Sequence, residues 1–268
     1  MQALHLYHIP AFRSARALWA FLELRAALGA TASTALPPLV VEHFSDVARF
    51  RNDKPRWFLE QVNPNGKVPA LVDPNVGATV FESCAVVAHL LEQYDPRGLL
   101  LTRSDARTRA QYHELAFLCA STLDNLAATS SPVQRAVLSQ LQREGRAAAM
   151  APVVNPANRE AWDSYLAPYL ERVLRERGGP FLLGDKFSAA DVVVGHALFG
   201  LHRKLIDRAV EGGSWLSAEW TPLLLAYAER VLRRPACVLA YTAPKELGPG
   251  VLMREAAAPS VPVPAARI

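Results

Sequence analysis

Residues 63–74 read NPNGKVPALVDP, a short apolar run enclosed by two polar turns. Asn, Pro and Gly before the run and Asp-Pro after it are typical of turns that bound a β-strand. Pro69 stands at the start of this strand, where its missing N–H removes one hydrogen bond from a sheet. The sequence therefore predicts either an edge strand or a backbone bend at Val68-Pro69 that serves a purpose of its own.

The segments around this stretch alternate between strand and helix patterns, over residues 1–95. Short apolar runs predict strands at Leu4–Ile9, at residues 37–44 (PPLVVEHF), at residues 68–72 (VPALV) and at residues 78–82 (ATVFE). Helical spacing of apolar residues predicts helices over residues 14–28, 54–62 and 83–94. The order β-α-β-α-β-β-α predicts a mixed four-stranded sheet with helices on its faces.

From Ser104 onward the pattern is helical only. Candidate helices are Asp105–Ala128, Val133–Ala149, Arg159–Arg177, Ala189–Ala209 and Pro222–Arg233. We therefore predict a first domain over residues 1–95, a linker over 96–104 and an all-helical domain over 105–243. The Pro/Ala-rich tail, residues 244–268, is expected to be extended or disordered.

One capping signal stands out in the helical part, LLGDKFSAADVVVG at residues 182–195. Ser188 is followed three residues later by Asp191, which approximates a capping box in which the third residue bonds back to the first. We interpret the pair as a helix start; a catalytic Asp191 is the alternative.

Composition limits the classes of partner. The 268 residues are 51% hydrophobic and carry a formal net charge of +4. The basic residues are spread along the chain without an aromatic-rich basic cluster, so nucleic acid is not expected. The three widely spaced cysteines predict neither a disulfide framework nor a metal site. The first residues lack signal-peptide features and no apolar run is long enough to span a bilayer, so a cytoplasmic protein is expected.

Taken together, the order of elements and five motifs resemble the cytosolic type of glutathione transferase from about Ala3 to Tyr241. The motifs are LYHIPAFRSARALWAFLEL, NPNGKVPALVDP, TVFESCAVVAHLLEQYDP, LLGDKFSAADVVVG and AYAERVLRRPA. The resemblance implies the glutathione transferase fold, with an α/β thioredoxin-like domain followed by an all-α domain. It also implies that the peptide bond before Pro69 is cis.

In the family, glutathione is the co-substrate and no metal takes part, so the resemblance implies binding residues here. The backbone N–H and C=O of Val68 would pair with the cysteinyl unit like an added strand, beside Pro69. Ser83, at a helix start, would hold the γ-glutamyl carboxylate, or be only an N-cap. Glu82 would face the α-amino group. Lys67 would reach a carboxylate, or be merely solvated; His43, Arg56 and Trp57 are further candidates for the glycyl end.

Thiol activation is less clearly encoded, because Ala11 or Phe12 stands where many classes of the family carry a catalytic Ser or Cys. The remaining candidates are Ser14, Arg13 and Tyr7. Ser14 would donate to the sulfur, or only cap the helix. Arg13 would stabilise a thiolate by its charge, or be a solvated surface residue. Tyr7 supplies another hydroxyl, although its spacing is short for the Tyr-dependent classes.

The resemblance implies a transferase that activates the glutathione thiol for attack on a small hydrophobic electrophile, with a role in detoxification. It also implies a homodimer. The alternative is a non-catalytic relative that binds ligands or other proteins, which the absence of a hydroxyl at Ala11 and Phe12 favours.

Overall fold

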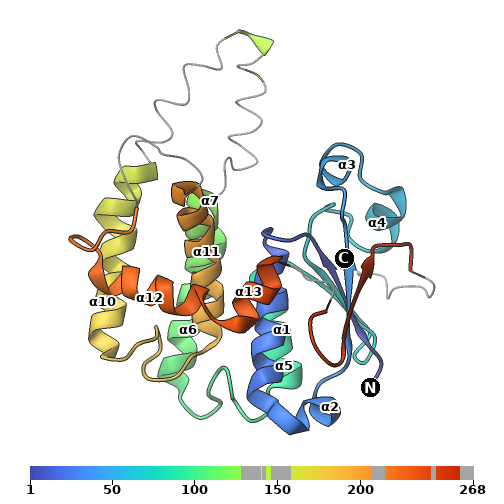
Figure 1. Ribbon diagram of the computed structural model, residues 1–268, viewed down its shortest axis with the longest axis horizontal. Helices are drawn as coiled ribbons and strands as arrows, with labels where there is room; N and C mark the ends of the chain where they lie inside the picture. Colours follow the sequence, from blue (N-terminus) through green and yellow to red (C-terminus); the bar gives the residue numbers. More distant parts are fainter. Residues whose placement is uncertain (128–139, 141–142, 146–157, 207–214, 243–245, 260–268) are drawn as a thin grey trace. The chain divides into compact units, whose positions relative to one another are not determined.

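The computed structural model describes residues 1–127, 140, 143–145, 158–206, 215–242 and 246–259. The chain divides into two compact units (Figure 1). Unit 1 comprises Met1–Arg109 and Arg233–Ile268, and unit 2 comprises Ala110–Leu232. The predicted helix Val133–Ala149 lies almost wholly outside the described residues.

Unit 1 contains a five-stranded mixed sheet in the order β4-β3-β1-β2-β5. The strands are β1 (Leu4–His8), β2 (Leu39–His43), β3 (Ala70–Asp73), β4 (Ala78–Phe81) and β5 (Val251–Glu255). The helices of the unit are α1 (Ser14–Leu28), α2 (Ala32–Ala35), α3 (Val47–Asn52), α4 (Arg56–Gln61), α5 (Ser83–Tyr94) and α13 (Pro235–Thr242), with a 3₁₀ turn, η1 (Gly29–Thr31). The first four strands and the order of elements were predicted; β5 was not.

Strand β5 lies within the tail that was expected to be extended or disordered, and it is extended and paired in the sheet. It pairs in parallel with β2, along the edge that β2 would otherwise expose, and Figure 1 shows it in red at the sheet. An unpaired edge leaves a row of backbone donors and acceptors open, so an added strand satisfies them. The Pro and Ala residues of the tail do not favour a strand, but VLMRE at residues 251–255 between them forms one.

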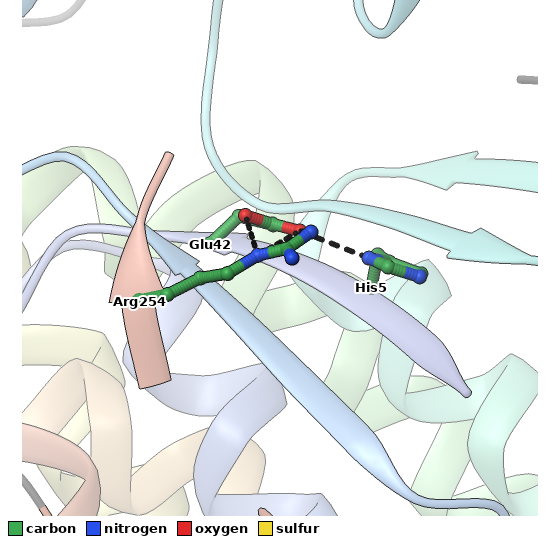
Figure 2. Close-up of polar contacts among 3 residues, drawn as sticks. All are labelled: His5, Glu42 and Arg254. Carbon is green, nitrogen blue, oxygen red and sulfur yellow. Dashed lines mark hydrogen bonds and ion pairs between the residues drawn. The ribbon is translucent and has the colours of Figure 1, made fainter. Parts of the chain in front are cut away.

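A buried carboxylate explains why this segment docks on β2. Glu42 is 2% exposed and accepts hydrogen bonds from Arg254, at 2.6 Å from Nη2 and 3.0 Å from Nε. The ring of His5 lies 2.9 Å from the same carboxylate, so β1, β2 and β5 are joined through one group (Figure 2). A charge buried in a sheet needs such partners.

The two faces of the sheet are covered differently. The face that carries Tyr7 and Val72 packs against Phe50 of α3 and Phe58 of α4. On the opposite face lie α1 and α5, which contact each other. Every residue of helix α1 from Ser14 to Leu24 is buried. This agrees with its sequence, which is apolar on nearly all faces of the helix.

The hydrogen bonds of two buried carboxylates, Glu23 and Asp95, explain why unit 1 includes segments outside the predicted first domain. Glu23 of α1 is 3% exposed and accepts two hydrogen bonds of 2.6 Å from Arg234, which holds α13 on α1. The predicted linker packs against the end of α5, because the buried Asp95 accepts bonds from the N–H groups of Leu99 and Leu100 at 2.7 and 2.9 Å. Residues 233–242 and 96–104 therefore belong to unit 1.

Unit 2 is helical over its described residues. It contains α6 (Ala106–Leu118), most of which lies in this unit, α7 (Asp124–Ala127), α10 (Ala167–Arg177), α11 (Ala189–Ile206) and α12 (Pro222–Leu232), with π-helical segments η2 (Cys119–Leu123) and η4 (Trp162–Leu166). Asp191 accepts a 2.7 Å bond from the N–H of Ser188, which confirms the predicted reach-back of the capping pair.

Candidate functional site

Three segments of unit 1 meet at one end of the sheet. The register pairs Tyr7 with Ala70, and Ala70 with Phe81. Since Val68-Pro69 precedes Ala70 and Glu82-Ser83 follows Phe81, the two predicted binding dipeptides lie beside each other. The loop that follows β1, residues 9–13, reaches the same end.

The turn before β3 presents the backbone of Val68. The peptide bond between Val68 and Pro69 is cis, as the resemblance implied. Asn63 is 1% exposed and shapes the turn, because its Nδ2 donates to the C=O of Lys67 at 2.8 Å. Within the described part of the chain, neither the N–H nor the C=O of Val68 takes part in a hydrogen bond. Both groups are therefore available to a peptide-like ligand.

At the start of α5, Ser83 is supported by an arginine that the sequence analysis did not assign to the site. Arg16 of α1 is fully buried, and its Nη1 donates to Ser83 Oγ at 2.7 Å and to Cys84 Sγ at 3.3 Å. A positive charge thus lies at the N-terminus of a 12-residue helix, whose free N–H groups already favour an anion. An arginine in the otherwise apolar first turns of α1 is the signal that could have indicated it.

Glu82, which precedes α5, has a backbone φ of 65°. This is the left-handed region, which residues other than glycine rarely adopt. Ala11, in the loop before α1, has a φ of 59°. These are the two positive-φ residues other than glycine in the described chain, and both border the same end of the sheet. Strained backbone of this kind concentrates at ligand sites.

The side chain of Ser14, at the start of α1, is hydrogen-bonded to the backbone of the preceding loop. Ser14 is fully buried; its Oγ donates to the C=O of Ile9 and accepts from the N–H of Ile9, both at 3.1 Å. It is the first residue of α1, and no side chain caps that helix. Ser14 is thus not the predicted cap, and its one hydroxyl proton is already used within the loop. Arg13, half-buried, stands at the N-cap position.

Tyr7 lies in an aromatic cluster and not in a polar setting. Its ring centroid is 5.4 Å from Phe58 and 6.1 Å from Trp57. Burial, with the nearby charge of Glu42, raises the pKa of the phenol well above its usual value. The raised pKa keeps the phenol protonated, but its ring is only 2% exposed among other aromatic rings, which does not favour contact with a ligand sulfur.

The remaining candidates are more peripheral. Lys67 and Glu82 are exposed, as ligand-facing charges would be. Arg56 is paired with Glu60 at 2.7 Å on the surface of α4. His43, at the end of β2, has its ring centroid 6.3 Å from that of His8; burial and the charge of His43 lower the pKa of His8 to about 3. His8 is therefore neutral at physiological pH.

The described residues lack a metal-binding cluster and a membrane-spanning helix. No group of three or more His, Cys, Asp or Glu side chains is placed to hold a metal ion there. None of the helices in the described ranges combines the length and apolarity needed to cross a membrane.

Comparisons with known proteins agree with this geometry. The family model of the glutathione S-transferase N-terminal domain matches residues 6–98, and that of the C-terminal domain matches residues 158–244. Curated relatives include the glutathione S-transferase-like protein OpS6 of Beauveria bassiana, 31% identical over 141 residues, or 49% of this chain and 55% of that protein. Glutathione S-transferase F13 of Arabidopsis thaliana is 31% identical over 131 residues, with 49% and 55% covered. The chain matches about half the length of these relatives.

Solved structures show the same fold. A glutathione transferase homologue from Sulfitobacter with bound glutathione superposes with a TM-score of 0.62 at 22% identity, covering 91% of this chain and 99% of that one. Ure2p5 from Phanerochaete chrysosporium, crystallised with 1-(S-glutathionyl)-2,4-dinitrobenzene, has a TM-score of 0.63 at 18% identity, covering 91% and 94%. The predicted thioredoxin-like and all-helical fold is confirmed, and the chain belongs to the glutathione S-transferase family.

Proposed function

We propose that this chain binds glutathione at the end of the sheet that carries Val68 and Ser83, and activates its thiol for attack on a small hydrophobic electrophile. The observation that carries the proposal is the unbonded N–H and C=O of Val68 beside the start of α5. The cysteinyl unit would pair with Val68 next to Pro69, and the γ-glutamyl carboxylate would lie at Ser83. Glu82 would receive the α-amino group and Lys67 a carboxylate.

Arg16 acts as a positioning residue for this site. Because its Nη1–H donates to Ser83 Oγ at 2.7 Å, the hydroxyl accepts from the protein and keeps its own proton for the ligand. The guanidinium also adds a full positive charge to the partial charge at the helix end. A carboxylate is therefore the group that this subsite favours.

Activation of the thiol is assigned to Arg13 and the N-terminus of α1. A free thiol has a pKa of about 8.5, so the protein must stabilise the thiolate to use it at neutral pH. Ser14 is bonded to Ile9 and Tyr7 is buried among aromatic rings, which leaves Arg13, at the N-cap of a 15-residue helix. Its cationic side chain and the helix dipole would both favour the negative sulfur.

The proposal includes a small hydrophobic electrophile as the second substrate. The Ure2p5 structure holds an S-glutathionyl dinitrobenzene, which supports aryl halides as test substrates. We further propose that the protein is a cytoplasmic homodimer with a role in detoxification.

The second candidate function is a non-catalytic glutathione-binding module. It is favoured by Ala11 and Phe12 in the loop before α1, which lack a hydroxyl or thiol, and by the hydrogen bond of Ser14 to Ile9.

Replacing Ser83 tests the binding site. We expect Ser83→Ala to weaken glutathione binding about tenfold, because the carboxylate loses one hydrogen bond to a site that remains positive. Ser83→Thr keeps the hydroxyl and should keep most of the affinity. Isothermal titration calorimetry measures both, with Ser45→Ala, an exposed serine of unit 1, as the control. An affinity equal to wild type in Ser83→Ala, or no binding by wild type, contradicts the proposal.

Replacing Arg13 separates the two candidate functions. If Arg13 stabilises the thiolate, Arg13→Gln should raise the pKa of the bound thiol by about 0.5–1 unit, and Arg13→Lys should raise it less. Titration of thiolate absorbance in the glutathione complex gives this pKa, and turnover of an aryl halide should fall in parallel. A wild-type complex whose thiol titrates like free glutathione would favour the non-catalytic module.

A further inference from the structure

A groove with apolar walls runs along the C-terminal half of α1. Its volume is about 330 Å³, and it is partly open to solvent. The walls come from α1, α2, α13 and the tail segment before β5, and include Leu22, Ala26, Ala32, Ala236, Leu239 and Leu247. This volume is at the lower end of the range of about 300–1,000 Å³ for small-molecule sites.

The groove is separate from the proposed glutathione site. That site lies at the N-terminal end of α1, near Ser14, whereas the groove includes Arg25 and Gly29 at the opposite end. A helix rises 1.5 Å per residue, so Ser14 and Arg25 are roughly 16 Å apart along the axis. A molecule in the groove would not occupy the positions beside Val68 and Ser83.

Arg25 is the one charged residue among the described residues that line the groove. Its Nη1 is buried and has no hydrogen-bond partner in the described part of the chain. The guanidinium lies against the tail, with Nη2 3.3 Å from where a Cβ on Gly248 would be. Burial also lowers the pKa of Arg25. A buried donor without an acceptor is unfavourable, so a ligand that brings an acceptor to Nη1 would be stabilised here.

The ligand chemistry follows from this combination of one cation and apolar walls. A carboxylate would accept from Nη1 of Arg25 in a charge-assisted bond. An unbranched hydrocarbon chain would lie against the leucine and alanine side chains of α1 and α13. We propose that the groove binds a small alkanoate, one per chain, independently of glutathione.

Calorimetry with the full chain and a series of alkanoates tests this proposal. Hexanoate, octanoate and decanoate should bind saturably, and the dissociation constant should fall about fourfold with each methylene that the groove buries. Arg25→Met should weaken octanoate binding at least tenfold, while octanol, which lacks the charge, should bind both proteins equally. Arg25 lies on a half-exposed helix position, so the variant is expected to fold.

A second pair of variants tests the location. Ala26→Trp places an indole in the groove and should abolish octanoate binding, whereas Ala27→Trp, on an exposed neighbouring position that does not line the groove, should leave it unchanged. Saturating S-methylglutathione should not displace octanoate. The proposal is overturned if no alkanoate binds saturably, if Arg25→Met binds octanoate as wild type does, or if S-methylglutathione competes. If the protein binds octanoate but not glutathione, only the proposed transferase function is contradicted.

Discussion

Asp191→Ala is expected to destabilise the helical unit by about 3–4 kcal/mol, the largest effect of any substitution considered. Asp191 is fully buried, and its carboxylate accepts from the N–H of Leu182 at 3.0 Å and from the N–H and Oγ of Ser188 at 2.7 and 2.8 Å. Alanine leaves three buried donors without an acceptor. Urea unfolding followed by circular dichroism gives the change in the free energy of unfolding, and hydrogen exchange should show lost protection in α11.

Two variants make the Asp191 result specific. Asp191→Asn keeps one acceptor oxygen and should cost less than the alanine variant. Asp163→Ala removes an exposed carboxylate of the same unit, which pairs with Arg159 at 2.6 Å on the surface. Such pairs contribute about 0–1 kcal/mol, so little change is expected. Equal losses in Asp191→Ala and Asp163→Ala would show that the buried bonds do not stabilise the helix start.

Arg254→Met should destabilise unit 1 by about 2 kcal/mol at neutral pH, because Glu42 would stay buried after losing its main cation. The loss is smaller than for a fully buried pair, since Arg254 is 52% exposed and His5 remains near the carboxylate. Removing the charge should also weaken the docking of β5 on β2, although their backbone pairing remains. Hydrogen exchange in β2 and β5, with the free energy of unfolding, measures both effects.

The same variant has a predicted pH dependence. Burial alone would raise the pKa of Glu42, but hydrogen bonds from His5 and Arg254 outweigh it and hold the pKa below its usual value. A carboxyl whose folded pKa is lowered stabilises the fold above its unfolded pKa of about 4.3, and loses that contribution as the pH falls through the folded value. The difference between wild type and Arg254→Met should therefore shrink below about pH 4.

Arg56→Met is the matched control for Arg254→Met. Arg56 also pairs with a glutamate in unit 1, but its side chain is 89% exposed and that of Glu60 is 55% exposed. We expect a change of less than about 0.5 kcal/mol with no marked pH dependence. A pH-independent loss in Arg254→Met would mean that the variant acts through packing of the arginine stem and not through the charge of Glu42.

The sequence by itself determined the features that depend on local pattern. The first four strands and their helices follow from apolar periodicity, and the helix start at Ser188 from its capping residues. Val68-Pro69 and Ser83 are the binding pair that the motifs predict, and the register of β3 with β4 places them beside each other. Neighbouring residues in the chain supply all of this information.

Only the tertiary structure decided which residues from distant segments meet. The support of Ser83 by Arg16 joins residues 67 positions apart, and the pairing of Glu42 with Arg254 joins residues 212 apart. Ser14 illustrates the same limit, because its residue type allowed a cap, a donor to sulfur or a loop bond, and the fold of residues 9–14 selected the last. A buried charge or hydroxyl must find a partner, but which one it finds depends on packing between segments that local sequence patterns do not encode.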